Sequence, residues 1–482
     1  MARRDALSRP RGAAGFGRAL FALAAILGVA GISGAAACKG RDDGRTLVRF
    51  WAFGREGEEV RALVPEFERR NPDLRVEVQQ VPWTAAHEKL LTAYVGDALP
   101  DAAQMGNTWI PEMQALGVLA PLGTRIARSK SFDRADSFDG VWDSNQVGGE
   151  IWGVPWYVDT RVIFYRTDLL ARTHVPWPPR SWADWRAAMV AVRALSPDRF
   201  AILLPIDEWA QVMTLAQQRG APLLKDGGRH GDFAEPRFRA ALDFYVGLFR
   251  AGLAPPLDQS GLANLYQQFA EGYFAMFISG PWVLTEMERR LPPEMQDRWA
   301  TAPLPPPEAG GEYPGSSLAG GASLVVFRGA KEPEGAWRWI EYLSEPAQQA
   351  EFFRRAGDLP SRRSAWESTG LAGDARATTF LTQLARVSPS PKVPEWEQIG
   401  ARLAVATEQV VRGARDADSA LAALDADADR ILEKRRFLLD RAASKRVSLG
   451  VSAIPERLAA AEAARRSEEM GENPRDRAEA HW

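Results

Sequence analysis

The chain has 482 residues and a formal net charge of −2, with 60 basic and 62 acidic side chains and one cysteine. This length suffices for about two or three domains of average size, each with its own core. The nearly balanced charge argues against nucleic-acid binding, which needs clustered positive charge, so we expect no nucleic-acid partner. One cysteine cannot form a disulfide within the chain, so folding has to rely on core burial.

The first 37 residues have the order of a secretory signal, with a basic start, an apolar middle and small residues at the end. Five arginines precede the uncharged stretch 19–37, which ends in three alanines directly before Cys38. We interpret 1–37 as a lipoprotein signal peptide, because the one cysteine stands at the predicted cleavage point. Cys38 would then carry the lipid, and 38–45 would form a tether. An ordinary signal peptide or an N-terminal membrane helix, with Cys38 incidental, is the alternative.

The chain after this signal has a net charge of −6 and no second uncharged run approaching the roughly 20 residues of a spanning helix. We therefore expect an extracytoplasmic protein, in the periplasm or at the cell surface, anchored to the membrane by a lipid on Cys38. Lys39 follows the cysteine, and this residue does not indicate whether the protein is anchored in the inner or the outer membrane.

From residue 46 the hydrophobic pattern predicts an α/β fold. Extended runs alternate with segments of helical periodicity, at the spacing of a parallel sheet. Ligands of such sheets bind beyond the carboxyl ends of the strands, which here are followed by the loops 54–56 and 106–109. The expected strands of this first unit are 46–51, 74–81 and 101–105, and its expected helices are 58–70 and 85–95.

A second α/β unit is predicted after residue 159. Asp159 stands between two extended runs, 151–158 and 160–166, where a polar residue between apolar strands indicates a domain crossing with a functional side chain. The later expected strands are 200–204, 273–278 and 323–327, and the later expected helices are 185–195, 236–249, 333–343, 346–356 and most of 401–435.

Tryptophan is unusually frequent, with 17 residues against 8 tyrosines. Most should be buried, but several stand beside Asp, Asn or Gly. Aromatic faces next to polar groups suit sugar rings, whose C–H faces are apolar and whose hydroxyls need hydrogen bonds. The tryptophans in such surroundings are Trp51, Trp109, Trp142, Trp156, Trp209 and Trp282, of which we expect Trp156 to be a core residue.

A series of short motifs in a fixed order carries a family resemblance. They are Phe67-Glu-Arg-Arg-Asn-Pro72, Pro100-Asp101, Gly153-Val-Pro155, Tyr165-Arg-Thr-Asp-Leu169, Pro179-Arg-Ser-Trp182, Phe269-Ala-Glu-Gly272, Ala275-Met276, Ser279-Gly-Pro-Trp282 and Ala336-Trp-Arg-Trp-Ile340. Between about residues 46 and 435 the chain resembles the extracellular solute-binding proteins of ABC importers, of the sugar-binding class that includes maltose-binding protein.

The resemblance implies a periplasmic-binding-protein-like α/β fold of two lobes, each a sheet flanked by helices, joined by a hinge. It implies a monomeric receptor rather than an enzyme, which binds a sugar or oligosaccharide and delivers it to ABC permease subunits without a cofactor or metal. The expected boundaries are 46–158 plus 304–358 for lobe 1, 159–303 plus 359–436 for lobe 2, and 437–482 for a tail, partly helical or disordered.

The resemblance also implies ligand-binding positions, carried over by motif. The first loop holds Arg55-Glu56 instead of the Asp-Lys type of pair found in maltose binders, and the acid at the crossing is Asp159 instead of a longer Glu, so the identity of the sugar stays open. The implied positions are Glu56, Asn107, Trp109, Tyr157, Asp159, Arg161, Trp209, Trp282, Gly321 and Arg362.

Two other functions remain as alternatives. One is a secreted carbohydrate-active enzyme of the glycosidase type, for which Asp159 and Glu56 could supply the two carboxylates. The other is a binding protein for a different solute, such as glycerol phosphate or a polyamine. A serine nucleophile at 315–319 lacks a partner His in any motif, and His87-Glu88 lacks the second His of a zinc-protease motif.

Overall fold

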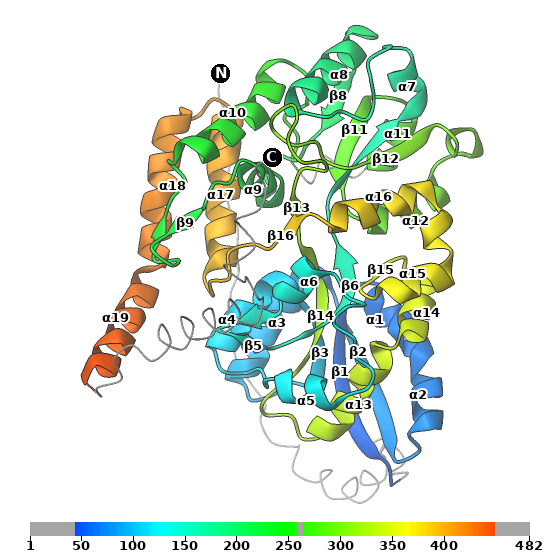
Figure 1. The fold of residues 1–482 in the computed structure, drawn as a ribbon, viewed down its shortest axis with the longest axis vertical. Coiled ribbons are helices and arrows are strands. Elements are labelled where there is room, and N and C mark those ends of the chain that lie inside the picture. The colour runs from blue at the N-terminus through cyan, green and yellow to red at the C-terminus, as the bar shows by residue number, and fades with distance from the viewer. Residues whose placement is uncertain (1–43, 259–263, 449–482) are drawn as a thin grey trace, which may run out of the picture. The chain divides into compact units, whose positions relative to one another are not determined.

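The computed structural model describes residues 44–258 and 264–448. The predicted signal peptide and Cys38 therefore lie outside the described residues, as do residues 449–482 of the predicted tail. The described body is a two-lobed α/β protein, as the sequence predicted (Figure 1).

Lobe 1 is built on a six-stranded sheet with the strand order β15-β6-β14-β3-β1-β2. β1 runs parallel to β2 over eight residue pairs and parallel to β3 on its other side. β14 is antiparallel to both β3 and β6, so a strand from the second half of the chain lies in the middle of the sheet. The bounds are Thr46–Phe53 for β1, Leu74–Val81 for β2, Ala102–Gly106 for β3, Val154–Asp159 for β6, Gly320–Val326 for β14 and Leu359–Pro360 for β15.

Helices cover this sheet and bury an aromatic core. The rings of Phe50 and Trp156 meet edge to face at 6.3 Å, and those of Phe50 and Trp339 at 5.9 Å. All three side chains are fully buried, so Trp156 is a core residue as predicted. The covering helices are α1 (Glu56–Glu59), α2 (Val64–Arg70), α3 (Trp83–Val95), α4 (Ile110–Ala115), α5 (Gly123–Arg128), α13 (Pro333–Leu343) and α14 (Pro346–Ala356).

The single helix predicted over 58–70 is divided in the structure. α1 passes into a 3₁₀ turn, Val60–Leu63, and α2 then begins with Pro65 in its first turn. Proline is well placed there, because its missing N–H would have no partner within the helix. Val60, Leu63 and Phe67 are nevertheless all buried, so the predicted apolar face is preserved.

Lobe 2 is built on a four-stranded sheet with the order β12-β7-β11-β8. Its helix α8 begins directly after Ser181, whose hydroxyl caps the helix by accepting a hydrogen bond from the Asp184 N–H at 3.1 Å. The strands are β7 (Val162–Arg166), β8 (Phe200–Leu203), β11 (Phe274–Ser279) and β12 (Trp299–Ala302), and the main helices are α7 (Thr167–Ala171), α8 (Trp182–Ala194), α9 (Trp209–Gln218), α10 (Pro236–Arg250), α11 (Leu265–Ala270), α12 (Trp282–Arg290), α16 (Ala375–Leu384), α17 (Trp396–Val411) and α18 (Ala417–Ile431).

Smaller elements complete the description. α19 follows α18 and reaches into the segment that the sequence analysis assigned to a tail (Figure 1). No helix in the described ranges combines the length and the apolar character needed to cross a membrane. The small elements are α6 (Asp139–Asp143), β4 (Gln146–Val147), β5 (Glu150–Ile151), β9 (Leu224–Lys225), β10 (His230–Gly231), α15 (Arg363–Thr369) and α19 (Glu433–Ser448).

The chain crosses between the lobes where β6 passes into β7 and where β13 (Ser317–Leu318) passes into β14. The Ser317 hydroxyl binds these two crossings together, because it donates to the Arg161 carbonyl at 2.9 Å and accepts from the Arg161 N–H at 3.1 Å. β13 also pairs in parallel with β16 (Val387–Ser388). Leu304 packs in the core of lobe 2, so the second crossing lies near residue 319 and not near 304 as the expected boundaries had it.

Asp101 fastens the chain at the start of β3. Its side chain is 2% exposed, and one carboxylate oxygen accepts a hydrogen bond from the Arg49 N–H at 2.8 Å. The other oxygen accepts from the N–H groups of Lys331 and Glu332, at 2.7 and 3.0 Å. One buried side chain thus joins β1, β3 and the approach to α13.

We predict that Asp101→Ala lowers the free energy of unfolding by about 3 kcal/mol, because three backbone donors lose a charged acceptor. Urea unfolding measures this change. Asp198→Ala, in an exposed loop of lobe 2, is the control and should change stability by less than about 0.5 kcal/mol. Equal stability of the two variants would contradict the anchoring role of Asp101.

Candidate functional site

A cavity of about 710 Å³ lies between the two lobes, beyond the carboxyl ends of β1 and β3 and beside the first crossing. Its size is within the roughly 300–1,000 Å³ typical of small-molecule sites. Nine of the ten sequence-predicted positions line it, from both lobes: Glu56, Asn107, Trp109, Tyr157, Asp159, Arg161, Trp209, Trp282 and Gly321.

A chain of hydrogen bonds fixes Glu56 in the wall of lobe 1. The Phe53 N–H at the end of β1 donates to Gln104 Oε1 at 2.7 Å, and Gln104 Nε2 donates to the Tyr157 hydroxyl at 2.9 Å. That hydroxyl donates to Glu56 Oε1 at 2.8 Å. Burial and the Glu56 carboxylate raise the pKa of Tyr157 well above its ordinary value, so the hydroxyl keeps its proton and remains a donor.

Trp83 supplies a second donor to the same carboxylate, from its indole Nε1 to Glu56 Oε1 at 3.0 Å. This approach requires Gly54, whose φ is +56°. A Cβ at Gly54 would lie 2.4 Å from the Trp83 ring, so no side chain fits at this position. The glycine loop after β1 therefore brings Glu56 and Trp83 together.

The loop after β3 adds Asn107 and Trp109. Asn107 is 4% exposed and its Oδ1 accepts from the Ser323 hydroxyl at 2.8 Å, while its Nδ2 has no partner among the described residues. The Trp109 ring packs against Trp83 at 5.6 Å and against Phe53 at 5.9 Å. Asn107 thus offers a free amide donor beside a fixed aromatic wall.

The first crossing places an ion pair at the centre of the cavity wall. Arg161 Nη1 lies 2.5 and 2.6 Å from the two oxygens of Asp159, and Nη2 lies 3.9 Å from Glu208. Burial raises the pKa of the Asp159 carboxyl, and the charge of Arg161 opposes that rise. Both Asp159 oxygens already have a donor, so Asp159 holds the guanidinium in place.

Trp282 is the large aromatic ring that lobe 2 presents to the cavity. Its side chain is 42% exposed at the start of α12, and the Arg161 guanidinium lies 4.7 Å from the ring centroid. Trp209, at the start of α9, is half-buried against Trp396 at 5.6 Å. The exposed ring of Trp282 and the packed ring of Trp209 therefore line the same cavity.

Gly321 is required by the backbone. Its φ is +123°, and a Cβ there would lie 2.3 Å from the Tyr157 carbonyl oxygen. This close approach of β14 to β6 places the Tyr157 side chain in the cavity wall. A side chain at 321 would separate the two strands.

Arg362 does not line this cavity, unlike the other nine predicted positions. Its guanidinium donates to Asp136 Oδ2 at 2.7 Å and to the Ser131 carbonyl at 2.7 Å, and its side chain is buried. Arg362 therefore joins two loops of the fold. Trp51, Trp142 and Trp156, three of the tryptophans beside polar residues, are likewise buried.

Further residues of the wall escaped the sequence analysis. Trp83 follows the end of β2 directly, so the rule that led to the loops after β1 and β3 would also have found it. Glu208 precedes Trp209, and Asp358 stands just before β15, where the sequence gives no motif. The missed residues are Arg55, Trp83, Glu208, Glu286 and Asp358.

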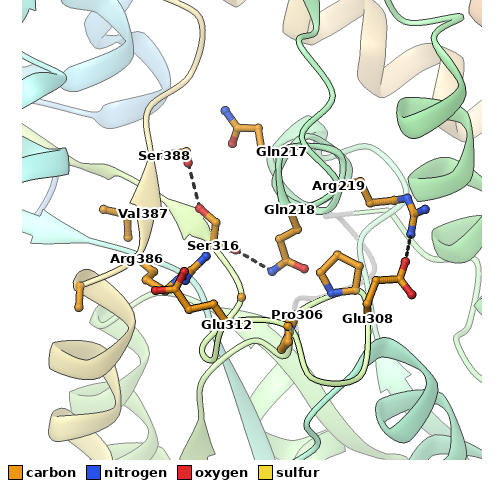
Figure 2. A pocket seen from close by; sticks show the side chains of 14 residues that line it. Gln217, Gln218, Arg219, Pro306, Glu308, Glu312, Ser316, Arg386, Val387 and Ser388 are labelled. Atoms are coloured by element: carbon orange, nitrogen blue, oxygen red, sulfur yellow. Dashed lines mark hydrogen bonds and ion pairs between the residues drawn. The ribbon is translucent and has the colours of Figure 1, made fainter. Parts of the chain in front are cut away.

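A second cavity, of about 690 Å³, lies beside β13 and β16 and holds none of the predicted positions (Figure 2). Several of its polar groups pair with one another, although Gln217 Oε1 and Arg219 Nε have no partner among the described residues. Ser316 and Ser388 share a hydrogen bond of 2.9 Å, Gln218 Nε2 donates to the Ser316 carbonyl at 2.6 Å, and Arg219 pairs with Glu308 at 3.1 Å. The cavity between the lobes is therefore the better candidate for a ligand site.

Comparisons with known proteins show to which family the chain is related. Residues 53–350 match the model of the bacterial extracellular solute-binding protein family. The sugar-binding protein MalE of Xanthomonas citri is 47% identical, with a TM-score of 0.78, over 82% of this chain and 99% of that one. The diacetylchitobiose-binding protein DasA of Streptomyces coelicolor is 24% identical over 78% of this chain and 90% of its own length. The GacH receptor of Streptomyces glaucescens shares the fold, with a TM-score of 0.70 at 22% identity over 81% of this chain and 99% of that one.

We predict that Tyr157→Phe lowers the free energy of unfolding by about 1–3 kcal/mol, because the buried amide of Gln104 loses its acceptor and Glu56 loses a donor. Urea unfolding of the ligand-free protein measures the loss. Tyr94→Phe is the matched control, since Tyr94 is exposed and its hydroxyl makes one long hydrogen bond of 3.3 Å. A loss no larger than that of the control would show that the hydrogen-bond chain contributes little.

Proposed function

The chain belongs to the family of bacterial extracellular solute-binding proteins, and on that premise we propose that it binds a sugar or oligosaccharide between its two lobes. The similarity to a sugar-binding protein at 47% identity supports this ligand class. The observation that carries the proposal is the joint presence of aromatic rings and fixed polar groups in one cavity.

A sugar matches the chemistry of this wall. Its C–H faces pack on rings such as Trp282 and Trp109, and its hydroxyls can use both a free donor and free acceptors. Asn107 Nδ2 is an unused donor, while the carboxylates of the wall are acceptors. Single polar groups among aromatics fix the orientation of a ligand and give specificity.

The two lobes would work by closure. Lobe 1 contributes Glu56 and Asn107, lobe 2 contributes Trp282, and a ligand that contacts both stabilises the arrangement in which all contacts form. Arg55 of lobe 1 and Glu286 of lobe 2 approach to 3.8 Å across this space. A loaded, closed receptor would then be the form that ABC permease subunits recognise.

The wall is less suited to a glycosidase that uses Glu56 and Asp159, and to an anionic solute such as glycerol phosphate. The two carboxylates considered for a glycosidase are both engaged, since Tyr157 and Trp83 donate to Glu56 and Arg161 pairs with Asp159. An anionic solute needs a free cation, whereas Arg161 pairs with Asp159 and Arg55 with Glu59. We therefore propose a receptor without catalytic activity.

We predict that a neutral di- or trisaccharide raises the melting temperature of the protein and that Trp282→Ala weakens this binding at least tenfold. Loss of a stacked ring costs about 1–3 kcal/mol of binding free energy, by analogy with buried aromatic anchors. Thermal shift with maltose, maltotriose and diacetylchitobiose finds the ligand, and calorimetric titration measures its affinity.

Trp282→Phe is the matched variant for this test, because it keeps an aromatic face and should bind with intermediate affinity. The melting temperature without ligand should stay nearly unchanged in both variants, since the ring is 42% exposed. Chromatography of the sugar after incubation with the protein should show the sugar intact. A released product would favour the alternative function of a carbohydrate-active enzyme. Equal affinity of wild type and both variants would mean that the ring does not contact the sugar.

We also propose that a lipid on Cys38 holds the receptor at the membrane, and we predict that Cys38→Ser releases it. Thiol lipidation supplies the acyl chains, and a serine at this position cannot be modified in the same way. Detergent phase partitioning of expressed full-length protein measures the effect. The wild type should enter the detergent phase. The variant should either enter the aqueous phase or remain an unprocessed precursor. Identical partitioning of the two proteins would refute the lipid anchor.

A further inference from the structure

Asp358 occupies an unusual place in the cavity wall. It follows Gly357, which ends α14 with a φ of +84° and turns the chain toward β15. A Cβ at Gly357 would lie 2.4 Å from the Thr285 hydroxyl of α12, so the backbone here passes close to lobe 2. Asp358 itself is 8% exposed and lines the cavity.

The side chain of Asp358 is mostly buried, and its carboxyl oxygens have no donor among the described residues. No hydrogen bond or ion pair of its side chain exists within the described ranges, whereas Glu56 and Asp159 in the same wall each accept two hydrogen bonds. Burial raises the pKa of the Asp358 carboxyl well above its ordinary value, and the charges of Glu56 and Asp159 add to the rise, which Arg55 opposes.

Such a group costs stability in the ligand-free fold. A buried carboxylate that lacks partners loses its hydration without compensation. A residue that carries this cost and faces a cavity is a candidate for ligand contact, since a ligand can supply the missing donor. Asp358 lines the cavity, so a ligand there can reach its carboxyl group.

We propose that Asp358 contacts the ligand and determines specificity, by accepting a hydrogen bond from a hydroxyl of an uncharged sugar and by repelling anionic sugars. This inference rests on the proposed function and adds a residue and a substrate class to it. A carboxyl group at a fixed place in the wall favours a hydroxyl at one defined position of the sugar, and the hydrogen bond is strongest when the carboxyl group is ionised.

Repulsion of anions follows from the charges around the cavity. Five carboxylates line it against two guanidinium groups, and both guanidinium groups are paired. A ligand carboxylate or phosphate would therefore meet like charges. The five are Glu56, Asp159, Glu208, Glu286 and Asp358, and the two are Arg55 and Arg161.

The stability of the ligand-free protein gives a readout that a structural role for Asp358 would not produce. Since the folded-state pKa lies above the ordinary value of 3.8, the folded protein binds more protons at this group than the unfolded chain does. Stability therefore falls as the pH rises from about 3.8 through the folded-state pKa. Asp358→Asn removes this term and should raise the melting temperature at pH 7.

The experiment compares wild type, Asp358→Asn and the control Asp198→Asn, whose exposed side chain is remote from the cavity lining. Calorimetric titration uses maltose, maltotriose and diacetylchitobiose as neutral probes and digalacturonic acid as the anionic probe. Asp358→Asn should bind the best neutral probe at least tenfold more weakly than wild type, and the control should bind it equally. Wild type should bind digalacturonic acid at least a hundredfold more weakly than the best neutral probe. In Asp358→Asn the ratio of these two affinities should be smaller.

The outcomes separate this inference from the function on which it rests. If no neutral probe binds wild type, the proposed function fails and the inference fails with it. If wild type and Asp358→Asn bind the neutral probe equally, or if wild type binds the anionic probe as tightly, the inference alone is wrong. A lower melting temperature of ligand-free Asp358→Asn at pH 7 would show that Asp358 supports the fold and would likewise overturn it.

Discussion

The candidate site depends on the hydrogen-bond chain that runs from the Phe53 N–H through Gln104 and Tyr157 to Glu56. Each residue of this hydrogen-bond chain lies on a different strand or on the helix that follows β1, so its geometry depends on the spacing of the strands in the sheet. Because every link is buried, each donor and acceptor is costly to leave unpaired. The site therefore inherits the rigidity of lobe 1, and a ligand meets a wall whose carboxylate is already oriented.

Lobe 2 reaches the same cavity through Arg161, whose position is fixed twice. Its backbone is bound to Ser317 on the neighbouring crossing, and its guanidinium is held by Asp159. The guanidinium in turn lies over the Trp282 ring, which is otherwise open. The residues that connect the lobes are thus also residues of the cavity wall. A ligand in the cavity therefore contacts the same residues that move when the lobes rotate about the crossings.

Sequence reasoning succeeded where local pattern determines structure. Strand alternation predicted β1 and β2, and the periodic helices α13 and α14 were predicted at their observed bounds. The strand-end rule indicated the loops after β1 and β3, in which the resemblance selected Glu56 and Asn107, and both residues line the cavity. It failed where distant segments meet. Arg362 was expected near the ligand by resemblance, but its partner Asp136 lies 226 residues away along the chain and is not signalled by any motif. Asp358 was missed for the same reason, since its burial arises from packing between α14 and lobe 2.

The contrast between Glu56 and Asp358 shows how one wall can combine fixed and open acceptors. Glu56 accepts two hydrogen bonds from the protein through Oε1 and therefore contributes an oriented charge at a lower cost in stability. Asp358 is unsatisfied and keeps its full hydrogen-bonding capacity for a guest. A cavity built only from groups of the first kind would be stable and weakly selective, because each acceptor would already have a donor. A cavity built only from the second kind would destabilise the lobe that carries it. In the observed wall, Asp358 and the Asn107 amide carry that cost. Asp358 stands where lobe 1 and lobe 2 approach each other, so a donor brought by a ligand compensates the cost when the ligand contacts both lobes.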